Sequence, residues 1–139
     1  MEKDLKDLLL RDLCARLSYG VKVQYYDYES ERVEIDVVEG CENMDTKHPY
    51  FYVGQYSLSL DKLKPVLYPM SSMTEEQKIE YNRLRDFVPT YHYEYGDIVE
   101  DTELYDNDGS IDYLNAHYFD YRGLIEKGLA IDATNLNVY

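Results

Sequence analysis

The apolar residues near the start of the chain change their spacing at Gly20. Before Gly20, leucines recur at three- and four-residue intervals, the period of one helix face, and they are Leu5, Leu8, Leu9, Leu13 and Leu17. After Gly20, every second residue is apolar over residues 21–25 and again over 33–37, which is the period of a strand with one buried face. The polar residues 29–31 separate these two runs. The sequence therefore predicts a helix over residues 3–17 followed by a β-hairpin.

The next part of the chain predicts one more strand and then a connection. Residues 50–60 have the aromatic and apolar content of a third strand, interrupted by Gly54. Pro65 and Pro69 follow, and because proline lacks an N–H and restricts the residue before it, we expect residues 64–70 to be a connecting segment on the surface. The three strands would form a small antiparallel sheet, either open or curled like a barrel.

Two helices are predicted in the second half of the chain. Thr74-Glu75-Glu76-Gln77 is a capping box, in which the threonine and glutamine side chains bind each other's backbone N–H groups, and the helix would end at Pro89. Ser110 can cap a second, short helix that carries Ile111 and Leu114. We expect four apolar residues near the end of the chain to return to the core, namely Leu124, Ile125, Leu129 and Ile131.

Together these patterns predict an α+β fold. An N-terminal helix packs on the small antiparallel sheet, and a capped helix and a short helical C-terminal region follow. The 139 residues suffice for one domain with its own core, so we expect a single domain spanning residues 1–139.

The sequence also bears on the cellular setting. No apolar run reaches the roughly 20 residues of a membrane span, and the opening Met1-Glu2-Lys3-Asp4 lacks the basic and then apolar order of a signal peptide. We therefore expect a cytoplasmic protein without a membrane partner. Cys14 and Cys41 have no Cys-x-x-Cys spacing, so we expect both to be free thiols.

Negative charge is concentrated in one segment. The net charge is −14, and residues 86–121 hold ten Asp and Glu with no Lys or Arg. The rest of the chain holds 18 acidic and 14 basic side chains, which nearly balance. Such an excess disfavours direct binding to nucleic-acid phosphates or anionic lipid, so we expect any partner contacted through charge to be a basic protein.

The acidic segment is also rich in tyrosine. Tyr91, Tyr93 and Tyr95 alternate with other residues, a pattern that fits either an edge strand or a solvated loop. One interpretation is a solubilising surface. The other is a binding face in which carboxylates imitate a phosphate array and tyrosines supply contact area. The residues of this hypothetical face are Asp97, Glu100, Asp101, Glu103, Asp106 and Asp108, with Tyr93, Tyr95 and Tyr105.

The sequence contains no complete motif for catalysis or cofactor binding. Asp106-Asn107-Asp108-Gly109 resembles part of a calcium loop, but that register puts Leu104 and Asn115 where carboxylates are required. No glycine-rich phosphate loop or Gly-x-Ser-x-Gly elbow is present. We therefore predict no catalytic residue, metal or cofactor. The alternative is a metal-dependent hydrolase that uses carboxylates between Asp97 and Asp112 with His92 or His117.

Three blocks of the sequence resemble a known family. They are residues 8–21 (Leu-Leu-Leu-Arg-Asp-Leu-Cys-Ala-Arg-Leu and then Tyr-Gly-Val), residues 64–76 around Pro-Met-Ser-Ser-Met-Thr-Glu-Glu, and residues 112–130. These blocks are similar to short proteins of prophages and other mobile elements in gut anaerobic bacteria. The resemblance implies an accessory role in such an element and no particular reaction, so it assigns no functional residue. Arg122 in the third block is expected to have an architectural role, through Asp120 or backbone carbonyls.

Overall fold

The computed structural model describes the backbone of residues 1–44, 48–85, 91–94, 97–100 and 108–139. Side chains are described for residues 1–44, 48–85 and 109–139. The chain forms two compact units. The first unit contains residues 1–72 and 118–139, and the second is the continuous segment 73–117. The α+β class predicted from the sequence is confirmed: the first unit holds a helix on a mixed sheet, and the second holds two helices and a hairpin.

Helix α1 spans Lys3–Arg16 and continues as the 3-10 helix Leu17–Tyr19. Gly20 ends it with a left-handed backbone (φ 73°) that glycine adopts without steric cost. Leu9 and Leu13 are fully buried, as their spacing predicts. Two charged residues of this helix, Asp12 and Arg16, are also completely buried.

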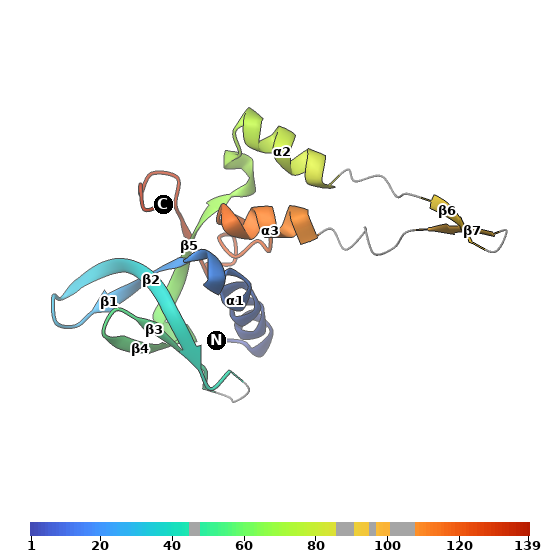
Figure 1. Ribbon diagram of the computed structural model, residues 1–139. Helices are drawn as coiled ribbons and strands as arrows, with labels where there is room; N and C mark the ends of the chain where they lie inside the picture. The colour runs from blue at the N-terminus through green and yellow to red at the C-terminus, as the bar shows by residue number, and fades with distance from the viewer. Residues whose placement is uncertain (45–47, 86–90, 95–96, 101–107) are drawn as a thin grey trace. The chain divides into compact units, whose positions relative to one another are not determined.

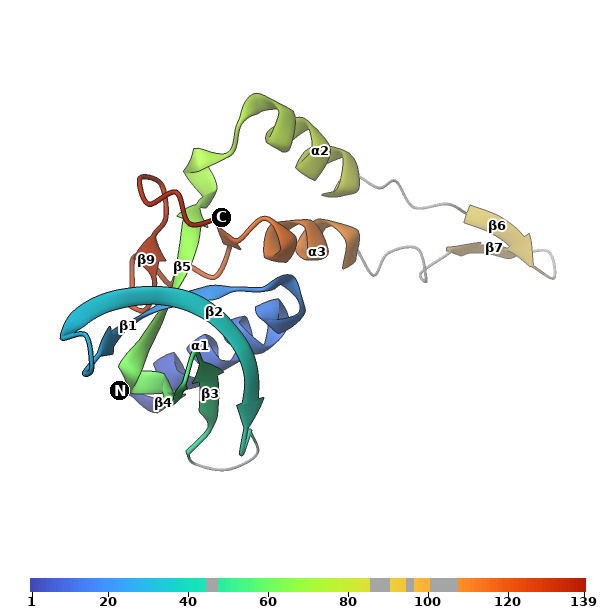
Figure 2. The same ribbon diagram turned by 60° about the vertical axis from the view of Figure 1, so that its left-hand side comes forward.

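The predicted hairpin is confirmed as β1 (Lys22–Asp27) and β2 (Arg32–Glu42), paired antiparallel. Val23 and Tyr25 point into the core, which is the face that their alternation predicts. The pairing of β2 with the next strand shifts register between Val38 and Gly40. Such an irregularity bends a strand, and Figure 2 shows β2 as a long, strongly curved ribbon.

The predicted third strand is instead two strands. β3 (Tyr50–Val53) and β4 (Tyr56–Ser59) form an antiparallel hairpin that turns at Gly54 and Gln55. Gly54 has a positive φ (58°), which is the conformation a two-residue hairpin turn needs at its first central position. The glycine that was interpreted as an interruption therefore reverses the chain.

The expectation of a surface connection at residues 64–70 is wrong. After the 3-10 helix Leu60–Lys62, residues Leu63–Pro69 form strand β5, in which Val66 and Leu67 are fully buried. Proline is tolerated because β5 changes partners along its length, so no single neighbouring strand takes a regular ladder of N–H groups from it. The 3-10 helix Met70–Ser72 follows it.

The sheet of the first unit is open. Its strand order is β4-β3-β2-β1-β5-β8, and β9 also pairs with β5 (Figure 1). β8 (Phe119–Asp120) and β9 (Ile131–Asp132) are short and run parallel to β5. The barrel-like alternative is thus not adopted. The end of the chain reaches the core as predicted for three of the four residues: Leu124 and Leu129 join the core and Ile125 packs against it, whereas Ile131 does not.

In the second unit, helix α2 spans Glu75–Arg85 and helix α3 spans Asp108–Ala116. The capping box is confirmed: Thr74 N donates to Gln77 Oε1 at 2.9 Å, and Gln77 N donates to Thr74 Oγ1 at 3.1 Å. Ser110 is not the cap of α3, because the helix begins two residues earlier and the serine lies inside it, 5% exposed.

The two helices contact each other. A Cβ placed on Gly109 would lie in ordinary van der Waals contact, 3.5 Å from Leu84 Cδ2, so these two residues face each other across the two helices. Among the described residues, no helix is long and apolar enough to cross a membrane.

Candidate functional site

Part of the predicted acidic face falls on a hairpin in the second unit. β6 (Tyr91–Glu94) pairs antiparallel with β7 (Asp97–Glu100), so residues 91–94 form a strand. The register places Glu94 opposite Asp97 and Tyr91 opposite Glu100. Three residues of the predicted face, Tyr93, Asp97 and Glu100, are thus part of this hairpin.

The other predicted members divide between a helix start and residues that the structure does not describe. Asp108 is the first residue of α3. Five members of the predicted face lie outside the residues that the structure describes, namely Tyr95, Asp101, Glu103, Tyr105 and Asp106. An acidic residue at the start of a helix is favourable, because the helix dipole places partial positive charge there.

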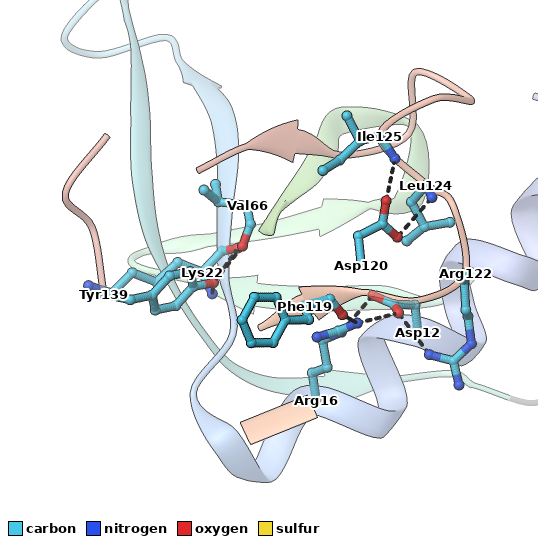
Figure 3. A network of polar contacts seen from close by, with 10 residues as sticks. All are labelled: Asp12, Arg16, Lys22, Val66, Phe119, Asp120, Arg122, Leu124, Ile125 and Tyr139. Atoms are coloured by element: carbon cyan, nitrogen blue, oxygen red, sulfur yellow. Dashed lines mark hydrogen bonds and ion pairs between the residues drawn. The ribbon is translucent and has the colours of Figure 1, made fainter. Parts of the chain in front are cut away.

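One carboxylate of the acidic run is used inside the fold. Asp120 is only 8% exposed, and its two oxygens accept hydrogen bonds of 2.9 Å from the backbone N–H groups of Leu124 and Ile125 (Figure 3). This carboxylate orders the turn after β8. It does not belong to an acidic surface.

The first unit contains a buried ionic network centred on Asp12. Its carboxylate accepts hydrogen bonds from Arg16 Nε at 3.0 Å and Nη2 at 3.1 Å, and from Arg122 Nη1 at 2.8 Å (Figure 3). Arg16 Nη2 also donates to the carbonyl of Phe119 at 2.5 Å. One carboxylate and two guanidinium groups thus join α1 to residues 119–122.

An aromatic ring lies beside both arginines of this network. The guanidinium carbon of Arg122 is 4.5 Å from the ring centroid of Tyr121, and that of Arg16 is 5.3 Å away. These are cation–π distances. Arg122 therefore has the architectural kind of contact that was predicted, but its partner is Asp12 and not Asp120.

Sequence reasoning missed this network for a physical reason. Asp12 and Arg122 are 110 residues apart, and nothing local in the sequence connects them. One signal was present: Asp12 and Arg16 are four residues apart and flank Leu13, so they share the apolar side of the helix.

A groove of mixed polarity lies in the first unit near the start of α1 and the start of β3. Two adjoining hollows of about 420 and 560 Å³ share Met1, Lys6, His48 and Pro49. The first also contains Ser59 and Asp61. Ser59 donates directly to Asp61 Oδ1 at 2.5 Å, whereas in an acyl-transfer triad a histidine stands between serine and carboxylate.

The charge of Asp61 argues further against activation of this serine. The hydrogen bond from Ser59 holds the pKa of the Asp61 carboxyl below its usual range, which makes this carboxylate a weak base. The arrangement is therefore a local polar contact at the end of β4.

Thiol and metal chemistry find little support in the described residues. Cys14 and Cys41 are free thiols, as predicted. Burial and, second, the neighbouring Cys41 raise the pKa of the Cys14 thiol, so little of the nucleophilic thiolate forms at neutral pH. Within the described part of the chain, no three His, Cys, Asp or Glu side chains are placed to hold a metal ion.

Comparison of the chain with protein families, with curated proteins and with solved structures finds no match.

Proposed function

We propose that the chain is a non-enzymatic interaction protein that binds a basic protein partner through its acidic, tyrosine-rich segment, residues 91–108. The observation that carries this proposal is the concentration of charge: residues 91–108 hold seven acidic and no basic side chains, while the other 121 residues hold 21 acidic and 14 basic ones. A segment of this kind presents to a basic groove what a nucleic-acid backbone presents. Acidic mimicry of nucleic acid is its most concrete form.

The arrangement of the second unit supports a binding role for the segment. α2 ends at Arg85 and α3 begins at Asp108, and the two helices pack side by side. The acidic segment therefore connects the end of one helix to the start of another helix that contacts the first. This arrangement limits the ordering entropy that binding costs.

The hairpin register gives a second argument. Residues directly opposite each other in an antiparallel pair are close, and like charges there destabilise the pair by up to about 1 kcal/mol. Glu94 and Asp97 are opposite residues of like charge. A cationic partner would relieve this repulsion, so the hairpin should gain stability on binding.

The resemblance to proteins of prophages and other mobile elements supports an accessory role of this kind, for example against a host protein that handles nucleic acid. The metal-dependent hydrolase remains the alternative class, and the experiment below is designed to distinguish the two.

The test uses two variants of equal charge. The segment variant changes six carboxylates to amides, at Asp97, Glu100, Asp101, Glu103, Asp106 and Asp108. The control variant does the same at six exposed carboxylates outside the segment, at Glu2, Asp7, Glu31, Glu39, Glu76 and Glu126. Each protein and the native chain are immobilised and exposed to bacterial lysate, and the retained proteins are identified by mass spectrometry.

We expect the native and control proteins to retain the same basic, nucleic-acid-binding protein, and the segment variant to lose it. Duplex DNA or raised salt should release the partner. Equal retention by all three forms, or retention of nothing, would contradict the proposal. Metal-dependent hydrolysis by the native chain that the segment variant lacks would favour the enzyme instead.

A further inference from the structure

The antiparallel pairing between β1 and β5 does not include Lys22, the first residue of β1. It joins Tyr25 to Leu63, Gln24 to Lys64 and Val23 to Pro65. In this antiparallel register the next pair would be Lys22 and Val66. A side chain stands between these two residues instead.

The hydroxyl of Tyr139 occupies this position. It accepts a hydrogen bond from the backbone N–H of Lys22 at 2.7 Å and donates one to the carbonyl oxygen of Val66 at 2.8 Å (Figure 3). The hydroxyl thus supplies the acceptor and the donor that a backbone rung would supply. Phenylalanine has the same ring and neither group.

The ring of Tyr139 also has a specific environment. It stacks on Tyr118 with 3.6 Å between ring centroids and 11° between planes, and it lies 6.1 Å from the ring of Tyr68. The ammonium group of Lys22 is 5.5 Å from its centroid, on the ring face. Tyr139 as a whole is 38% exposed, but its hydroxyl lies among backbone groups, and this desolvation raises the pKa of Tyr139 above its ordinary range, so the hydroxyl keeps the proton that it donates to Val66.

Little else holds the last residues of the sequence in place. Thr134, Asn135, Leu136 and Asn137 are all exposed, Leu136 to 40%. Beyond a turn bond from Leu136 N to Ala133 O, the described contacts of residues 135–139 are those of Tyr139 and a hydrogen bond from Lys22 Nζ to the carbonyl of Val138. Segments with few buried contacts open at low free energy.

From these contacts we infer that the gap between β1 and β5 is a tyrosine-binding slot, and that residues 134–139 are a releasable strap whose Tyr139 fills the slot from within the same chain. The slot is selective for a phenol: for the hydroxyl it has the N–H of Lys22 as donor and the carbonyl oxygens of Val66 at 2.8 Å and Lys22 at 3.4 Å as acceptors, and the ring lies between Tyr118 and the ammonium group of Lys22. When the strap opens, the slot accepts a tyrosine side chain from another peptide.

Amide hydrogen exchange of Lys22 tests whether the Tyr139 hydroxyl occupies the slot. In the native chain this amide should be protected, and in Tyr139→Phe it should exchange about tenfold faster, because the N–H loses its partner. Tyr68→Phe is the matched control: it removes a hydroxyl from the same aromatic cluster that makes no hydrogen bond within the described part of the chain. Amides of the β1–β2 ladder, which should stay protected in every variant, report that the fold is intact. Equal exchange at Lys22 in the native chain and in Tyr139→Phe would overturn the inference.

Binding in trans tests the slot itself. In Tyr139→Ala, p-cresol, the side chain of tyrosine as a free molecule, should bind saturably and restore protection at Lys22, whereas toluene should not. The native chain, with its slot filled, should show no such response. If Tyr139→Ala unfolds, refolding driven by p-cresol and not by toluene is the corresponding result. A variant indifferent to p-cresol, or one that responds equally to toluene, would contradict a phenol-selective slot.

Discussion

Asp12 and Arg16 place two charges inside the core of the first unit, where the surrounding protein must replace the water that they lose. The structure supplies bidentate hydrogen bonds between them, a second guanidinium from Arg122 and the carbonyl of Phe119. A buried ion pair of this kind contributes little net stability compared with an apolar pair, but the loss of one partner is costly. The network thus specifies how residues 119–122 attach to α1.

Replacement of Asp12 therefore has a large expected effect. Asp12→Ala leaves the guanidinium of Arg16 buried without its carboxylate, and we expect a loss of about 3–5 kcal/mol in the free energy of unfolding, measured by urea denaturation. Arg32→Ala breaks the exposed Arg32–Glu34 pair and should cost less than about 1 kcal/mol. Similar losses in the two variants would show that the network is not a buried, coupled one.

A second residue-scale prediction concerns Asp27. The hydrogen bond from the Tyr56 hydroxyl at 2.6 Å is the main cause that lowers the pKa of the Asp27 carboxyl below its ordinary value. Because the folded-state pKa is the lower one, the associated stability is present above the ordinary pKa and is lost as the pH falls through the folded-state value. Tyr56→Phe should raise the pKa of Asp27 in an NMR titration. Tyr26→Phe, a neighbouring control, should leave it unchanged, and an unchanged value in both variants would refute this assignment.

At the scale of elements, the capping box at the start of α2 gives a prediction for the second unit. Thr74→Ala removes the oxygen that accepts from Gln77 N, which should destabilise the helix by about 1 kcal/mol and speed exchange of the Gln77 amide. Thr74→Ser keeps an equivalent oxygen and should behave like the native chain. Equally fast exchange in both variants would mean that the cap does not hold α2.

Elements defined by local patterns could be predicted, and elements that depend on distant partners could not. The leucine spacing of α1, the alternation of β1 and the capping box of α2 are contained within short stretches, and each prediction is confirmed. β2 is a strand as predicted, but the buried face expected from its alternation is wrong, because Val33 is 58% exposed and the buried residue is Val38. β5 was missed because the prolines outweighed its apolar residues; what makes it a strand is its pairing with β1, β8 and β9. Ser110 has the chemistry of a cap, but α3 starts earlier, at Asp108.

At the scale of the whole molecule, the separation of charge could be predicted from composition and its geometry only in part. The carboxylates at 97 and 100 lie on one hairpin and Asp108 starts a helix, while Asp120 turns inward to bind two backbone amides. The sequence could not distinguish Asp120 from the others, because its partners follow from the turn after β8. The Tyr139 contacts were missed for the same reason, since Lys22 is 117 residues away.

We propose that the position of the negative charge, and not its total, makes the chain a ligand for a basic protein. The most direct measurement is the affinity of the captured partner for the native chain and for the two equal-charge variants as a function of salt concentration. We expect the control variant to keep the native affinity and its steep decline with salt, and the segment variant to lose both, because it lacks the concentrated charge. If the two variants lose affinity equally, only net charge matters, and the acidic segment is not a binding face.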